Sequence, residues 1–109
     1  MVNKDQLFLS TFKRSDDWPK VRRLFIKQHP ECSVCGARKR LTAHHIYPHY
    51  LYPALELEPT NLITLCENGA NHHLFVGHLM SFKSYNEHVV RDAEMWHKRI
   101  DTRPKWKPF

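Results

Sequence analysis

Two short stretches decide the fold: LTAHHI at residues 41–46 and NLITLC at residues 61–66. Both are short, partly β-branched and rich in apolar residues, so each predicts a β-strand, the second over residues 62–65. The segment between them, residues 47–59, contains three prolines and cannot stay regular for long. We expect it to form an ordered Ω-like loop between the strands of a hairpin, with a small apolar core of its own from Tyr47, Tyr50, Leu51, Tyr52 and Leu55.

Helices are predicted on both sides of this hairpin. The run Asp16-Asp17-Trp18-Pro19 combines acidic capping residues with a proline in the first turn, and it predicts a helix that ends at His29-Pro30. Another helix is expected to begin around His72, and the capping-box pattern at Ser84 predicts a last helix over residues 84–100. The apolar faces are expected to use Trp18, Val21, Leu24 and Phe25 in the first helix, and Tyr85, Val89, Ala93, Trp96 and Ile100 in the last.

The charge distribution suggests a polyanionic partner. The 109 residues carry 17 Lys and Arg against 11 Asp and Glu, a formal charge of +6. Residues 1–43 hold ten basic side chains, residues 81–109 hold seven, and the His-rich centre between them holds none. The basic helix face (Lys20, Arg22, Arg23, Lys27) is either a solvated surface or a phosphate-facing stripe, and the tail at residues 101–109 is either a frayed end or a nucleic-acid arm.

The cysteines favour a structural metal site that stabilises one small domain. Three cysteines cannot all pair as disulfides, and Cys32-x2-Cys35 has metal-ligand spacing, which also suggests a reducing cytosol. With Cys66, these thiolates need one more ligand to close a zinc tetrahedron, and His72 is the best candidate. The alternative is three ordinary buried cysteines. No apolar run is long enough to span a membrane and the start is not a secretory signal, so the chain is expected to be soluble and cytoplasmic.

The remaining histidines can form a second, chemical site. Successive side chains of a strand point to opposite faces, so His44 and His45 are not expected to bind one ion together. We expect His44 and His73 to hold a divalent ion with open positions, while His45 acts as a general base on water. Asn61 can accept a hydrogen bond from the ring N–H of His45, or it can tie down the loop backbone.

These elements together resemble the HNH endonuclease family, of the zinc-bearing type found in phages and mobile elements. The resemblance spans residues 18–78 and rests on Cys32-x2-Cys35, the run from Ala43 through Pro48, the run from Asn61 to Cys66, and His72-His73. It implies an α+β fold of the ββα-metal (His-Me finger) class, with a core at about residues 18–80 of a single 1–109 nuclease domain, a zinc knuckle and flanking helices. His78 lies five residues beyond His73, about 140° around an α-helix; it is either a third ligand or a residue that contacts phosphate or solvent.

The resemblance also implies an activity and partners. The expected activity is phosphodiester hydrolysis in double-stranded DNA, by nicking or double-strand cleavage, with His45 as base, Asn61 as the middle Asn, and His44 and His73 as ligands of Mg²⁺, Mn²⁺ or another divalent ion. A second copy of the chain or phage packaging proteins would be further partners, in a bacterial host cytosol if the chain is phage-encoded. The alternative is a noncatalytic zinc-stapled DNA-binding module. A Cys2His2 finger from Cys32, Cys35, His44 and His49 is disfavoured because its gap of eight residues is too short.

Overall fold

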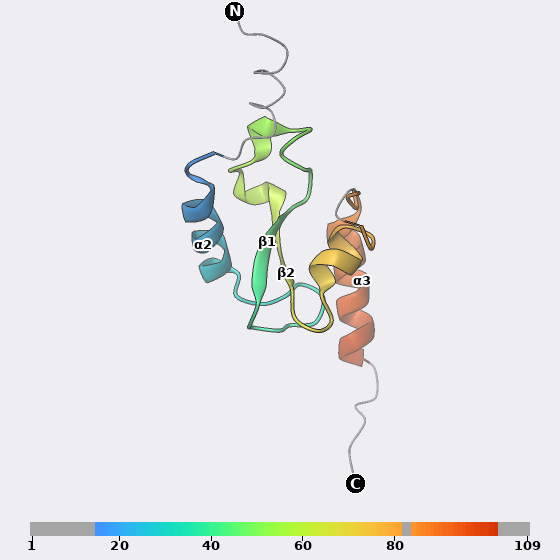
Figure 1. The fold of residues 1–109 in the computed structure, drawn as a ribbon. Helices are drawn as coiled ribbons and strands as arrows, with labels where there is room; N and C mark the ends of the chain where they lie inside the picture. Colours follow the sequence, from blue (N-terminus) through green and yellow to red (C-terminus); the bar gives the residue numbers. More distant parts are fainter. Residues whose placement is uncertain (1–14, 82–83, 103–109) are drawn as a thin grey trace, which may run out of the picture.

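The computed structural model describes residues 15–81 and 84–102, and it has the predicted α+β architecture (Figure 1). A two-stranded antiparallel sheet lies between one helix on its left and a short helical turn with a second helix on its right. The elements in chain order are α2 (Trp18–Gln28), β1 (Leu41–His45), the 3₁₀ turns η1 (Pro53–Leu55) and η2 (Pro59–Asn61), β2 (Leu62–Cys66), the π-helix η3 (His73–Gly77) and α3 (Val89–Thr102).

The hairpin confirms the two strands predicted from the sequence. In its register Leu41 lies opposite Cys66, and His45 lies opposite Leu62. All but the first residue of the ten in the two strands are buried, because both faces of the sheet are covered. The alternation of a strand therefore delivers His44 and His45 to different faces, each of them inside the protein.

Two apolar clusters hold the layers together. On one face, Phe25 of α2 packs with Ala43 and Leu62. The larger cluster, on the other side of the sheet, joins the strands to the cysteine segment, η3 and α3; its buried members are Cys32, Val34, Ile63, Leu65, Cys66, Val76, Val89 and Ala93. Leu24 was expected on the apolar face of the first helix, but 54% of its surface is exposed, so that prediction is wrong.

Both helix starts differ in detail from the expectation. The helix α2 has the predicted bounds, but the Asp17 side chain makes no capping hydrogen bond. The last helix begins at Val89 rather than residue 84, because Asn86 takes the capping role and accepts from the backbone N–H of His88. The Ser84 hydroxyl instead donates to the carbonyl oxygens of His78 and Ser81.

The loop between the strands is held by polar contacts rather than by the expected apolar core. Tyr47 and Tyr52 contact each other, with ring centroids 5.2 Å apart, but both are exposed, and so is Leu51. Residues 103–109, and with them most of the predicted basic tail, lie outside the described residues. Among the helices that the structure describes, none is long and apolar enough to cross a membrane.

Candidate metal centres and active site

The four predicted zinc ligands converge at one end of the hairpin. The ligand atoms of Cys32, Cys35, Cys66 and His72 all lie within 4.8 Å of one another. The Sγ atoms of Cys35 and Cys66 are 3.9 Å apart, and His72 Nδ1 lies 3.3 Å from Cys66 Sγ and 3.8 Å from Cys32 Sγ. A Zn–S bond of about 2.3 Å places sulfurs about 3.8 Å apart in a tetrahedron, so this donor set fits zinc.

Local backbone structure explains how the cluster forms. Cys32 and Cys35 lie in a tight knuckle, in which the N–H of Gly36 donates to the Cys32 carbonyl. Gly36 has a φ of 75°, a left-handed conformation that glycine adopts without steric cost. The five residues between Cys66 and His72 turn back sharply, with Asn68 Oδ1 accepting from the N–H of Ala70, and this turn offsets the long spacing.

The thiols of this cluster favour a bound cation. Burial is the main cause that raises the pKa of Cys35 to about 11, and the neighbouring Cys32 and Cys66 add to it. Burial also lowers the pKa of His72, which keeps its ring neutral. A thiolate becomes stable in such surroundings when a metal ion compensates its charge.

Three histidines form a second cluster of potential metal ligands. His44 comes from β1, His73 from η3, and His78 from the residue that follows η3, and one ligand atom from each lies within 4.8 Å of the others. The Nε2 atoms of His73 and His78 are 3.1 Å apart. The cluster shares no ligand with the cysteine site, although His72 and His73 are adjacent in the chain.

The π-helix places His78 beside His73. In an α-helix a separation of five residues is about 140° around the axis, which would point the two rings apart. In η3 the N–H of His78 instead donates to the carbonyl of His73, an i to i+5 bond that brings residues five apart onto the same face. The expected α-helical start at His72 is therefore corrected to a π-turn, and the angular objection to His78 as a ligand no longer applies.

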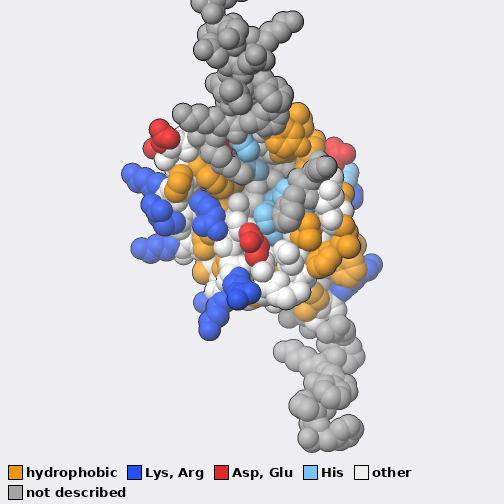
Figure 2. All heavy atoms as spheres, viewed as in Figure 1, with side chains coloured by type: hydrophobic (Ala, Val, Ile, Leu, Met, Phe, Trp, Pro, Cys, Tyr) orange, Lys and Arg blue, Asp and Glu red, His pale blue; other side chains and the backbone are white. Residues whose placement is uncertain are grey.

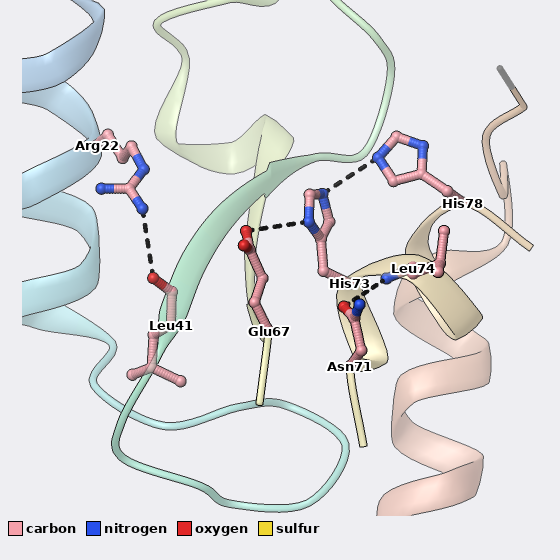
Figure 3. Close-up of polar contacts among 7 residues, drawn as sticks. All are labelled: Arg22, Leu41, Glu67, Asn71, His73, Leu74 and His78. Atoms are coloured by element: carbon pink, nitrogen blue, oxygen red, sulfur yellow. Dashed lines mark hydrogen bonds and ion pairs between the residues drawn. The ribbon is translucent and has the colours of Figure 1, made fainter. Parts of the chain in front are cut away.

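The outer nitrogens of two of these rings have partners of their own (Figure 3). Glu67 Oε1 lies 3.3 Å from His73 Nδ1, and His78 Nδ1 lies 2.8 Å from the Ser84 carbonyl oxygen. Because a carbonyl oxygen only accepts, His78 Nδ1 carries the proton and its Nε2 carries the lone pair. The Glu67 carboxylate favours the same tautomer in His73, in the pattern by which carboxylates orient metal-binding histidines.

These protonation states fit a metal ion. In these tautomers both Nε2 atoms present lone pairs across a 3.1 Å gap, so the two rings could both serve as ligands of one cation. The Nε2 of His44 is buried and has no hydrogen-bond partner. Burial, together with the neighbouring His73 and His78, lowers the pKa of His44 to about 2, so the ring is neutral and its lone pair is available to a metal.

His45 lies on the opposite face of β1, under different constraints. Its ring packs against Trp18 with centroids 4.3 Å apart, and its Nε2 lies 2.8 Å from the Glu56 carbonyl oxygen. Since that oxygen only accepts, Nε2 carries a proton, and in the neutral form of the ring the lone pair lies on Nδ1. This is the tautomer in which Nδ1 can take a proton.

Asn61 holds the loop, the second of the two roles that the sequence left open. Its Oδ1 accepts from the N–H of Tyr47, and its Nδ2 donates to the carbonyl oxygens of Tyr47 and Leu55. No described contact joins its side chain to the His45 ring. By fixing the chain at Leu55, Asn61 positions the following carbonyl, that of Glu56, which orients His45.

One cleft of about 370 Å³ is lined by both sets of histidines. It runs from α2 across β1 to η3, and its walls include His44, His45, His73 and His78. Figure 2 shows histidine side chains at the centre of this face. The sequence reasoning missed four residues around it: Trp18 as a ring partner, the Glu56 carbonyl, the Glu67 carboxylate and the Ser84 carbonyl. Only a pairing of Glu67 with a nearby histidine could have been guessed from the sequence.

One family model matches the central part of the chain. Residues 32–68 match the family model described as HNH endonuclease. The match covers the cysteine knuckle, both strands and the loop, and it ends before His72, His73 and His78. No curated protein and no solved structure gave a significant match.

Proposed function

Because residues 32–68 match the HNH endonuclease family model, we propose that the chain is a metal-dependent DNA endonuclease that hydrolyses phosphodiester bonds. The family match supports nuclease activity, metal binding and a DNA substrate in general. The observation that carries the specific proposal is the cleft in which a three-histidine cluster adjoins a histidine of fixed tautomer.

Each side chain then has a distinct role. His44, His73 and His78 would hold a divalent ion, which could be Mg²⁺, Mn²⁺ or another divalent ion. When bound, the ion supplies Lewis-acid stabilisation of the charge that develops on the phosphate and on the leaving oxygen. The cysteine cluster with His72 holds zinc and has a structural role only.

His45 acts as the general base. Its Nδ1 takes a proton from the attacking water as the water oxygen bonds to phosphorus and the bond from phosphorus to the leaving sugar oxygen breaks. The imidazolium that results keeps its Nε2–H on the Glu56 carbonyl, 2.8 Å away, which stabilises the positive charge. Asn61 is a positioning residue, since it acts through the loop that carries this carbonyl.

Cleavage of supercoiled plasmid with Mg²⁺ or Mn²⁺ tests the proposal. The parent chain should nick the plasmid, and His45→Ala should slow nicking by about 10²–10⁴-fold, the usual contribution of a general base. His88→Ala, which removes an exposed histidine remote from the cleft, is the matched control and should cut like the parent. Equal nicking by His45→Ala and the parent would remove His45 from the mechanism. If none of the three proteins nicks, a noncatalytic DNA-binding module becomes the better description.

A further inference from the structure

A second hollow lies beside the cleft and is lined by basic side chains. Arg22, Arg23 and Lys27 of α2 and Arg38 of the cysteine knuckle surround it, together with Ile26 and Leu41. We call these four basic residues the α2 groove. Arg23, Lys27 and Arg38 are exposed, and Arg38 pairs with the exposed carboxylate of Glu31.

The α2 groove is continuous with the cleft through Arg22. This residue lines both hollows, and its guanidinium donates to the Leu41 carbonyl at the start of β1, at 3.3 Å (Figure 3). Figure 2 shows the Lys and Arg side chains over α2 on the same face as the central histidines.

Two of these basic side chains lie close enough on α2 to repel each other, whereas Arg38 is already paired with Glu31. Arg23 and Lys27 are four residues apart on α2, where like charges lie side by side and weaken a helix by a few tenths of a kcal/mol. Arg38 adds a third charge from a different segment. A polyanion with evenly spaced charges relieves this repulsion, and DNA carries one such charge per nucleotide along each strand.

We propose that the α2 groove binds backbone phosphates of the duplex next to the phosphate that lies in the cleft. The inference rests on the proposed nuclease function and adds to it the direction in which the DNA leaves the site, along α2 and past Arg38. Contacts of this kind fix orientation and affinity without reading the sequence. The groove is therefore expected to contribute about equally to all duplex sequences.

The salt dependence of DNA binding tests the proposal without cleavage. Binding of a labelled duplex to the full chain carrying His45→Ala is measured by fluorescence anisotropy over a KCl series. Each lost phosphate contact should reduce the slope of log K against log [salt] by about 0.9. The triple variant Arg23→Gln, Lys27→Gln and Arg38→Gln should therefore reduce the slope by about 2–3. Arg22 is left in place because it also lines the cleft.

Two further variants make the result specific. The control Arg91→Gln, Lys98→Gln and Arg99→Gln removes the same charge from exposed positions on α3 and should change the slope by less than about one contact. The pair Arg23→Lys and Arg38→Lys keeps the charge and should keep the slope. Equal slopes for the two triple variants would overturn the proposal, and so would a large loss with the lysine pair. Plasmid nicking by the parent is scored separately, so the nuclease proposal can fail while the groove stands, and the reverse.

Discussion

Gly77 is the position at which the structure makes its sharpest quantitative prediction. A Cβ atom at Gly77 would lie 3.1 Å from both Cε1 and Nε2 of His44 and 3.1 Å from Cδ1 of Leu65. Leu65 is fully buried and His44 is 3% exposed, so neither side chain can move into open space. Gly77→Ala therefore has to displace a core leucine or a proposed metal ligand by a few tenths of an ångström.

Two opposing contributions set the size of the effect. Overpacking of a dense core by one methyl group costs about 1–3 kcal/mol. Replacing glycine by alanine restricts the unfolded chain and returns about 0.4–1 kcal/mol. Taking the midpoints, the net expectation for Gly77→Ala is a loss of about 1.3 kcal/mol in the free energy of unfolding, or about 5–10 °C in Tm at this chain length. Because the His44 ring is pushed, Mn²⁺ binding should weaken by about tenfold.

Urea unfolding measures the change in the free energy of unfolding, and isothermal titration calorimetry measures the change in Mn²⁺ affinity. Gly69 offers a matched control. A Cβ atom at Gly69 would meet nothing within 4 Å, so Gly69→Ala should gain about 0.4–1 kcal/mol from the restricted unfolded chain and bind Mn²⁺ as the parent does. If Gly77→Ala matches Gly69→Ala in both measurements, the close packing of His44 against η3 is refuted.

Three further predictions concern other parts of the molecule. Cys35→Ser should lose zinc and unfold or lose several kcal/mol, because a closed site contributes folding free energy; zinc quantification with circular dichroism checks this, and a melt matching that of His45→Ala would count against separate structural and chemical sites. Asn61→Ala removes three hydrogen bonds to the loop and should cost about 2–4 kcal/mol in urea unfolding; an unchanged midpoint would contradict its positioning role. Burial holds the folded pKa of His44 at about 2, below the ordinary 6.5, so the unfolded chain takes up this proton first. The contribution of the neutral His44 ring to the free energy of unfolding should be fully present above about pH 6.5 and should decrease as the pH falls below that value. In unfolding measured across the same pH range, His44→Gln should show a weaker dependence on pH.

Local sequence pattern was sufficient for the hairpin and for bringing together Cys32, Cys35, Cys66 and His72. Strand alternation separates His44 from His45, and the Cys-x2-Cys spacing predicts the knuckle, because both follow from the backbone geometry of a few neighbouring residues. The same local logic gave the bounds of α2. The helical pattern failed for Leu24, because spacing identifies the apolar face of a helix but does not show how much of that face the neighbouring strands cover.

Other features depend on tertiary contacts that spacing cannot reveal. Assuming α-helical geometry turns His78 away from His73, and only the i to i+5 bond of η3 reverses that conclusion. The partner that orients His45 is a main-chain carbonyl, which any residue at position 56 could supply, so no side chain signals it. Ser84 looked like a helix cap, yet its carbonyl and hydroxyl both contact His78.

The adjacent residues His72 and His73 belong to different clusters, and a single peptide unit joins them. An ion that draws His72 toward the sulfurs restricts where the next ring can lie, and the reverse holds equally. Thermodynamic linkage then requires that occupancy of either centre change the affinity of the other by the same factor. Loss of zinc would on this basis alter the affinity for the second cation even where its own ligands are intact.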